Sequence, residues 1–259
     1  GDVVPIDHHV TLATNRKAAY KTVIGQDGRL EVGTTIGHYL GDISGKGTLA
    51  LNFGKLPAGN YESFFTCSGG TIEYGGSTDY YLPDEGSTFR RLVLTGSGRR
   101  IFPDRDITIC DTLLLNGPVM DNNVNNNAIT INGLFDYQSG SFLSGTEASS
   151  NFIFSGAASQ QVIGNFTGSD AFYNLTLDNP NGLILSGDMD IIGTLYLTEG
   201  NITTTAADVL TIKEAGDVTP NGGSSSSYVT GPLTVELDNG ETFAFPVGDG
   251  SRYGKISLD

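Results

Sequence analysis

Residues 172–204 read FYNLTLDNPNGLILSGDMDIIGTLYLTEGNITT, and this stretch is the clearest indication of the fold class. Two apolar residues flank a single residue at Leu175-Thr176-Leu177 and again at Leu195-Tyr196-Leu197, and Gly, Asn or Asp follows within a few positions. Alternation with a period of two places both apolar side chains on one face of a strand, and Gly or Asn then permits a corner. The stretch therefore predicts very short strands separated by tight corners.

The same pattern recurs on both sides of this stretch. Further examples are residues 48–51, 92–94, 107–109, 129–131 and 210–212. Gly and Pro interrupt the chain at short intervals, and few segments place apolar residues at the helical positions i, i+3, i+4 and i+7. We therefore predict an all-β chain.

An internal repeat refines this prediction. Residues 89–119 align with residues 172–202 at an offset of 83, and residues 47–51 resemble residues 193–197 as a partial third copy. The repeating unit is thus about 82 residues long and contains several strand–corner segments. Short strands with one apolar face and frequent corners favour a right-handed β-helix, or β-solenoid, in which each coil hydrogen-bonds to the coils above and below it.

Shifts in composition divide the chain into three predicted parts. Residues 1–30 are interpreted as an N-terminal cap or the end of a preceding module, and residues 31–221 as the solenoid repeats. Residues 222–227 (GGSSSS) have the composition of a flexible link. Residues 222–259 are therefore expected to comprise this linker and the start of a further β-rich, sandwich-like module.

Composition and charge exclude several classes of protein. The 259 residues include 14 basic and 29 acidic side chains, which gives a formal net charge of −15. Such a balance disfavours a phosphate-neutralising surface, so no nucleic-acid partner is expected. The apolar runs are all far shorter than a membrane-spanning helix requires, so no helical membrane span is expected. The sequence begins without a signal-peptide pattern, and residues 256–259 read as part of a strand. We therefore expect the sequence to be a segment of a longer protein, with the rest of that protein among its partners.

Several segments resemble large, repetitive, adhesin-like surface proteins secreted by Bacteroidetes. They are residues 37–49 (GHYLGDISGKGTL), 56–61 (LPAGNY), 70–74 (GTIEY), 172–204, 222–233 (GGSSSSYVTGPL) and 245–253 (FPVGDGSRY). The resemblance covers residues 30–259 and preserves the order of the motifs. It implies export by the type IX secretion system, with the secretion machinery as a partner, and an extracellular, outer-membrane-associated location at the cell surface.

The resemblance also implies a function in adhesion or gliding motility. A stack of coils is a stiff rod, so the primary hypothesis is a non-enzymatic stalk that holds a binding tip away from the cell. Cell-surface or environmental glycans are the possible external partners. The alternative hypothesis is a β-helix carbohydrate-active enzyme, either a polysaccharide lyase or a hydrolase. That enzyme would need one groove with converging Asp or Glu and Lys, Arg or His, and the low basic content disfavours it, so no catalytic residue is assigned.

Two acidic pairs are the candidate metal site. Asp104 and Asp106 occupy repeat positions equivalent to those of Asp188 and Asp190, at an offset of 84. Carboxylates on one face of a strand can bind Ca²⁺, which is the one cofactor considered. In a polysaccharidase they would instead serve as acid and base. Their duplication favours a third interpretation, acidic corners on a solvated face, because a structural corner recurs in every unit.

Two further features concern covalent modification. Cys67 and Cys110 are well separated in the sequence and could form a disulfide between stacked coils, although two separately buried thiols are the favoured interpretation. Asp111-Thr112-Leu113 matches the short O-glycosylation tripeptide of secreted Bacteroidetes proteins, which makes Thr112 a candidate acceptor.

Overall fold

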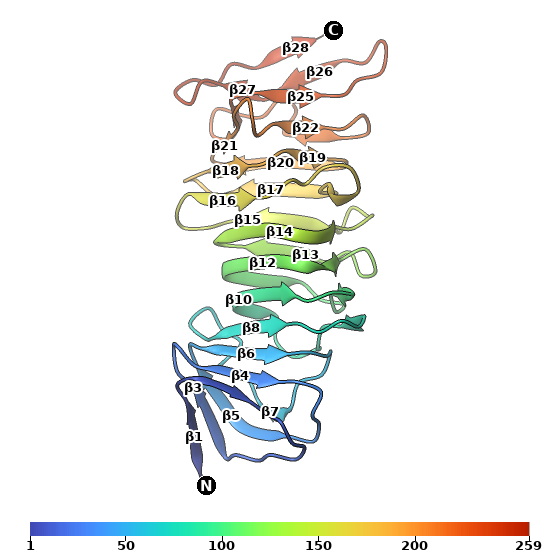
Figure 1. The fold of residues 1–259 in the computed structure, drawn as a ribbon. Coiled ribbons are helices and arrows are strands. Elements are labelled where there is room, and N and C mark those ends of the chain that lie inside the picture. Colours follow the sequence, from blue (N-terminus) through green and yellow to red (C-terminus); the bar gives the residue numbers. More distant parts are fainter. Residues whose placement is uncertain (259) are drawn as a thin grey trace.

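The computed structural model describes residues 1–258, and within them the only helical element is a single 3₁₀ turn, η1 (Gly168–Asp170). All other regular elements are strands. Apart from an antiparallel pair at the C-terminal end, the strands stack in parallel into a rod with the two termini at opposite ends (Figure 1). The predicted all-β solenoid is therefore confirmed.

Twelve strands stack in register on one side of the rod, which we call face A. They are β2 (His9–Thr11), β4 (Arg29–Val32), β6 (Thr48–Leu51), β8 (Thr71–Tyr74), β10 (Thr88–Thr95), β12 (Ile107–Asp121), β14 (Leu134–Leu143), β16 (Gln160–Ile163), β18 (Leu183–Ser186), β21 (Ile202–Thr203), β24 (Val229–Thr230) and β27 (Val247–Gly248). Each strand therefore marks one turn of the solenoid.

Two further rows of parallel strands complete the turns. Face B follows face A in each turn and contains β9 (Tyr80–Tyr81), β11 (Arg99–Ile101), the ends of β12 and β14, and then β19 (Met189–Ile191), β22 (Leu210–Ile212) and β25 (Leu233–Val235). Face C contains the starts of β10 and β12, then β13 (Ala128–Ile131), β15 (Asn151–Phe154), β17 (Asn174–Asp178), β20 (Thr194–Glu199) and β23 (Asp217–Thr219).

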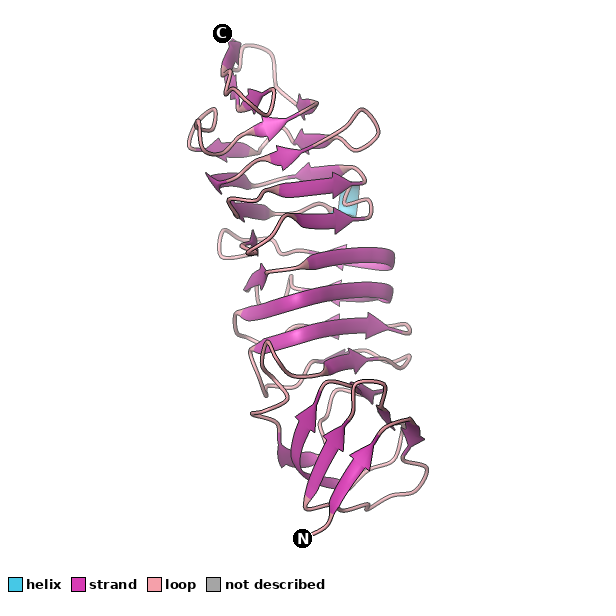
Figure 2. Cartoon of the chain, turned by 90° about the vertical axis from the view of Figure 1, so that its left-hand side faces the viewer, coloured by secondary structure: helices cyan, strands magenta, loops and turns pink. Residues whose placement is uncertain are grey.

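Both ends of the rod differ from its middle. At the N-terminal end, β1 (Val3–Ile6), β3 (Lys21–Ile24), β5 (Tyr39–Gly45) and β7 (Ala58–Asn60) form a parallel sheet that is inclined to the strands above it (Figure 2). At the other end, β26 (Phe243–Phe245) and β28 (Ile256–Leu258) form an antiparallel pair.

The three-part division predicted from composition is not seen in the strand pairing. Within residues 1–30, β1 and β2 already pair in parallel with β3 and β4. Beyond residue 222, β24, β25 and β27 continue the stack. The Gly-Ser segment is a turn inside a coil, because Ser227 is buried and its hydroxyl donates to the carbonyl of Gly200 at 2.7 Å. A segment tied to the coil below it is not a flexible link.

The offset of the sequence repeat is not the structural period of the solenoid. Leu92 pairs with Leu113 on face A, whereas its aligned counterpart Leu175 pairs with Leu195 on face C. Turns also differ in length, because the turn from Phe135 to its partner Val162 is half as long again as the turn from Val229 to Val247. All three faces use the same alternating pattern, so an alignment of sequence alone matches strands from different faces.

The interior of the rod is filled by the inward-facing side chains of all three faces. Phe135, Phe142, Phe152, Phe166 and Phe172 are fully buried, and their contacting rings have centroids 4.8–6.4 Å apart. Edge-to-face and tilted pairs of this kind add to the free energy gained by burying their area. The interior of the rod is therefore a packed hydrophobic core.

The charged side chain of Arg100 is wholly buried. Its guanidinium donates to backbone carbonyls at the corner between faces A and B, including those of Gly75 at 2.7 Å, Gly76 at 2.9 Å and Thr95 at 2.9 Å. The ring of Tyr80 lies 4.4 Å from its central carbon. Burial lowers the pKa of Arg100 below its usual value. This arginine therefore adds donors to a corner where the carbonyl of Gly75 also accepts the hydroxyl of Tyr80 and that of Gly76 also accepts the N–H of Ser97.

The same corner depends on stacked glycines. Gly96 has a φ of +81°, and a Cβ there would overlap the carbonyl oxygen of Gly76 in the coil below. Gly117, with a φ of +115°, stands in the same relation to Gly96. Coils at a spacing of about 4.8 Å leave no room for a side chain that points along the axis.

We expect Gly96→Ala to destabilise the rod more than Gly240→Ala. Both positions have a positive φ, so both variants lose about 1 kcal/mol from backbone strain, but nothing lies within 4 Å of a Cβ at Gly240. The overlap at Gly96 should add at least about 1 kcal/mol. Denaturant unfolding of both variants measures the difference, and equal losses would contradict the packed corner.

Candidate functional site

Two members of the predicted acidic pairs, Asp106 and Asp188, lie at corners of the solenoid and have the same structural role. Asp106 precedes face C in β12, and its Oδ1 accepts the backbone N–H of Ala128 at 2.9 Å. Asp188 immediately precedes β19, and its Oδ1 accepts the N–H of Val209 at 2.8 Å. In each case the donor is the residue in register one coil later. Each carboxylate therefore links two successive coils.

Other Asn and Asp side chains repeat this contact at further corners. The side-chain oxygens of Asp79, Asn165, Asn174 and Asn201 accept the N–H groups of Arg99, Asp188, Thr194 and Tyr228, respectively, at 2.7–3.2 Å. Neutral Asn and charged Asp serve equally, so the contact requires an oxygen acceptor and not a charge. These contacts support the interpretation of Asp106 and Asp188 as corner residues.

The other two members of the pairs differ from each other. Asp104 is exposed, whereas Asp190 is buried; its Oδ2 accepts the N–H of Gly168 at 3.1 Å and lies 4.0 Å from Nζ of Lys213. Within residues 1–258, no group of three or more His, Cys, Asp or Glu side chains is arranged to hold a metal ion. Ca²⁺ binding at these residues stays a prediction.

The two cysteines are joined in a disulfide. Cys67 lies in the loop between β7 and β8, and Cys110 lies in β12, with their Cα atoms 5.3 Å apart. The register places β12 two turns after β8 on face A, so the bond ties a loop to a coil beyond its immediate neighbour. The interpretation as two separately buried thiols is wrong. Spacing along the sequence does not reveal which turns are stacked, so it could not show whether the two cysteines meet.

Thr112 is poorly placed to accept a glycan in the folded chain. Its side chain is on face A, and the residue is only 7% exposed. The hydroxyl donates to Oδ1 of Asp111 at 3.1 Å. A sugar needs an accessible hydroxyl, so glycosylation here would have to precede folding.

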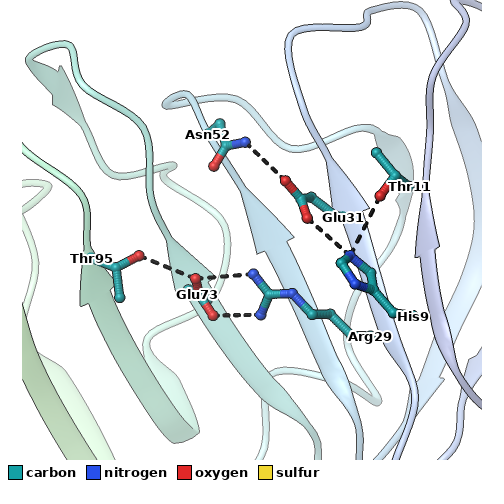
Figure 3. Close-up of polar contacts among 7 residues, drawn as sticks. All are labelled: His9, Thr11, Arg29, Glu31, Asn52, Glu73 and Thr95. Carbon is teal, nitrogen blue, oxygen red and sulfur yellow. Dashed lines mark hydrogen bonds and ion pairs between the residues drawn. The ribbon is translucent and has the colours of Figure 1, made fainter.

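A polar network that sequence reasoning missed lies on the outer surface of face A near the N-terminal end (Figure 3). Arg29 of β4 donates through both terminal nitrogens to Glu73 of β8, at 2.6 and 3.1 Å. It crosses the strand between them, β6, where Ala50 lies in register with Glu73 and is only 2% exposed. The hydrogen bond to Glu73 raises the pKa of Arg29. The pair therefore clamps three successive turns.

The network extends along the rod in both directions. Glu31 contacts Nε2 of His9 at 3.0 Å and accepts a hydrogen bond from the side-chain amide of Asn52 at 3.4 Å (Figure 3). Glu73 also accepts a hydrogen bond from the hydroxyl of Thr95 at 3.1 Å. Arg29 and Glu73 are far apart in the sequence, so only the register of the coils brings them together. In the sequence, the only indication of this network was the presence of polar residues at the outward positions of these strands.

A hollow with a volume of about 660 Å³ lies beside the loop after β7. Its lining includes Glu62 and Glu85 together with the edges of Tyr61 and Phe65. No Lys, Arg or His is among the lining residues described. The hollow thus lacks the basic partner that the polysaccharidase hypothesis requires.

Comparison with known proteins identifies no relative: no protein-family model, curated protein or solved structure matches the chain. Among residues 1–258, no helix is long and apolar enough to cross a membrane.

We expect removal of the disulfide to destabilise the rod. The Cys67→Ser/Cys110→Ser variant should lose about 2–4 kcal/mol, because the bond restricts the unfolded chain. Thermal melting of the oxidised protein, the reduced protein and the double variant measures the loss. Thiol titration of the protein made in an oxidising compartment is the control, and two free thiols would contradict the disulfide.

Substitution of Asp188 separates a corner role from a metal site. Asp188→Asn keeps an oxygen acceptor and should melt like the parent, whereas Asp188→Ala loses the bond to Val209 and about 1 kcal/mol. Melting is measured with excess Ca²⁺ and with EDTA. A Ca²⁺-dependent rise in the parent that both variants lack would favour the metal site over the corner.

Proposed function

We propose that this chain is a rigid spacer in a large secreted cell-surface protein of Bacteroidetes, exported by the type IX secretion system and acting in adhesion or gliding motility. The observation that carries the proposal is the uninterrupted stack of twelve strands on face A, with the termini at opposite ends (Figure 1). A spacer must hold its ends apart, and eleven steps of about 4.8 Å separate the first and last turns by about 53 Å.

The disulfide supports a location outside the cytoplasm. Structural disulfides form and persist in oxidising compartments and are rare where thiols are kept reduced. The bond between Cys67 and Cys110 links the loop before β8 to β12, two turns further along the stack, as expected of a stabilising cross-link. The net charge of −15 also supports a surface protein that stays soluble at high local concentration.

Contact between two of the motif segments supports the family resemblance. Tyr253, in residues 245–253, donates its hydroxyl to the carbonyl of Gly222 at 2.6 Å, and its ring packs against Tyr228 with the ring centroids 5.8 Å apart. Gly222 and Tyr228 belong to the GGSSSSYVTGPL segment. Motifs that are separate in the sequence thus form one structural unit, which explains why they would occur together.

The proposal predicts both a shape and a location. In solution scattering we expect a rod-like cross-section and a maximum dimension above about 55 Å, whereas a globule of this length would have a radius of gyration of about 18 Å and no rod regime. On intact cells of the source bacterium, added protease should remove the protein, and loss of the type IX channel should abolish that accessibility. A compact shape would contradict the spacer, and a protease-protected, cytoplasmic protein would contradict the location.

A further inference from the structure

A polar groove runs across the outer surface of the rod in its C-terminal half. It has a volume of about 540 Å³ and crosses five successive turns on the side where face C meets face A. The strands β16, β18, β21 and β27 of these turns lie one above another in Figure 1. The lining residues on which the argument depends are Ser159, Ile184, Asn201, Thr203, Ser225 and Thr230.

The floor of the groove is a column of outward-facing residues in register. Ile184 pairs with Thr203, and Thr203 pairs with Thr230. Ile184 is 42% exposed, which places an apolar surface among the hydroxyls. These residues lie on paired strands, so their positions are held by backbone hydrogen bonds to the coils on either side.

The sides of the groove come from two turns. The turn at residues 224–227 presents Ser225 and Ser226, both exposed. The turn at residues 249–252 is braced by Asp249, whose Oδ1 accepts the N–H groups of Ser251 at 2.9 Å and Arg252 at 2.7 Å. Both turns belong to the motif segments that contact each other through Tyr253.

The described residues that line the groove are all uncharged. Although the chain has a net charge of −15, none of the described residues that line this groove is Asp, Glu, Lys, Arg or His. Exposed hydroxyls on Ser159, Thr203 and Ser225 can both donate and accept hydrogen bonds. Asn201 uses its side-chain oxygen to accept the N–H of Tyr228, which leaves its amide nitrogen to donate. Such a surface suits a ligand rich in hydroxyl groups and without charge.

A buried hydroxyl at one end of the groove also points to a missing partner. Within the part of the chain that the structure describes, Oγ1 of Thr230 is buried without a hydrogen-bond partner. A buried polar group without a partner is unfavourable, because it has lost its hydrogen bonds to water and gained none in the protein. Gly250, which also lines the groove, lies beside this residue, because a Cβ at Gly250 would be 3.4 Å from Cγ2 of Thr230.

We propose that this groove binds a neutral oligosaccharide laid along the axis of the rod. Four steps of about 4.8 Å give it a length of about 19 Å, which suits several linked sugars. The hydroxyls and the Asn201 amide recognise sugar hydroxyls, and Ile184 packs against the apolar face of a ring. Binding goes beyond the spacer role, because a rod can hold two ends apart without any ligand.

The experiment uses the full 259-residue chain and ligand-observed NMR titration. Cellohexaose, xylohexaose, mannohexaose and maltohexaose are the neutral probes, and hexagalacturonic acid is the charged counterpart. We expect at least one neutral probe to bind and the acidic probe not to bind. Binding of none of the neutral probes, or of the acidic probe alone, would overturn the proposal.

Thr203→Glu and Thr219→Glu are the matched variants. Both Thr residues are exposed strand residues, but Thr203 lies on the groove floor and Thr219 lies on face C outside it. Thr203→Glu should weaken binding at least tenfold, and Thr219→Glu should leave it unchanged. Equal affinities in the two variants would overturn the assignment. Scattering on the same samples reports the rod shape, so loss of binding with an intact rod leaves the spacer proposal standing.

Discussion

In-register hydrogen bonding between parallel coils is the constraint on which the rest of this structure depends. Each turn must place a strand of face A directly above the previous one, so inward positions have to pack against residues of neighbouring turns. Leu92, Leu113 and Phe135 follow one another in this way and are fully buried. Because strand order is set by stacking, the loops between faces can vary in length, and successive turns therefore need not contain the same number of residues.

Corners are where this constraint is hardest to satisfy, because the chain must turn from one face to the next without leaving backbone groups unpaired. Three devices solve the problem here. Glycines such as Gly96 leave room for the carbonyl of the coil below, and Asn and Asp side chains such as Asp188 accept a hydrogen bond from an N–H of the next coil. Arg100 donates hydrogen bonds to several carbonyls at one corner. These devices explain why Gly, Asn and Asp recur at the corners of the chain.

Outward positions are free of the packing constraint, and the rod uses them differently along its length. Near the N-terminal end, Arg29 and Glu73 form a charged clamp over Ala50. In the C-terminal half, the equivalent column on face A contains Ile184 and Thr203 and forms the floor of an uncharged groove. One scaffold therefore presents two chemically distinct surfaces, and the outward-facing residues can differ along the rod without any change in the core.

The sequence by itself determined the all-β class and the stacked solenoid, because the alternation at Leu175-Thr176-Leu177 and the Gly and Asn corners are local features. It also indicated the corner role of Asp106 and Asp188 through their repetition. Only the tertiary structure decided which strands share a face, because turn length varies and all three faces use one pattern. The Cys67–Cys110 bond, the Arg29–Glu73 pair and the neutral groove all follow from that register. Each joins residues from different turns, and their separation along the chain does not reveal their separation in space.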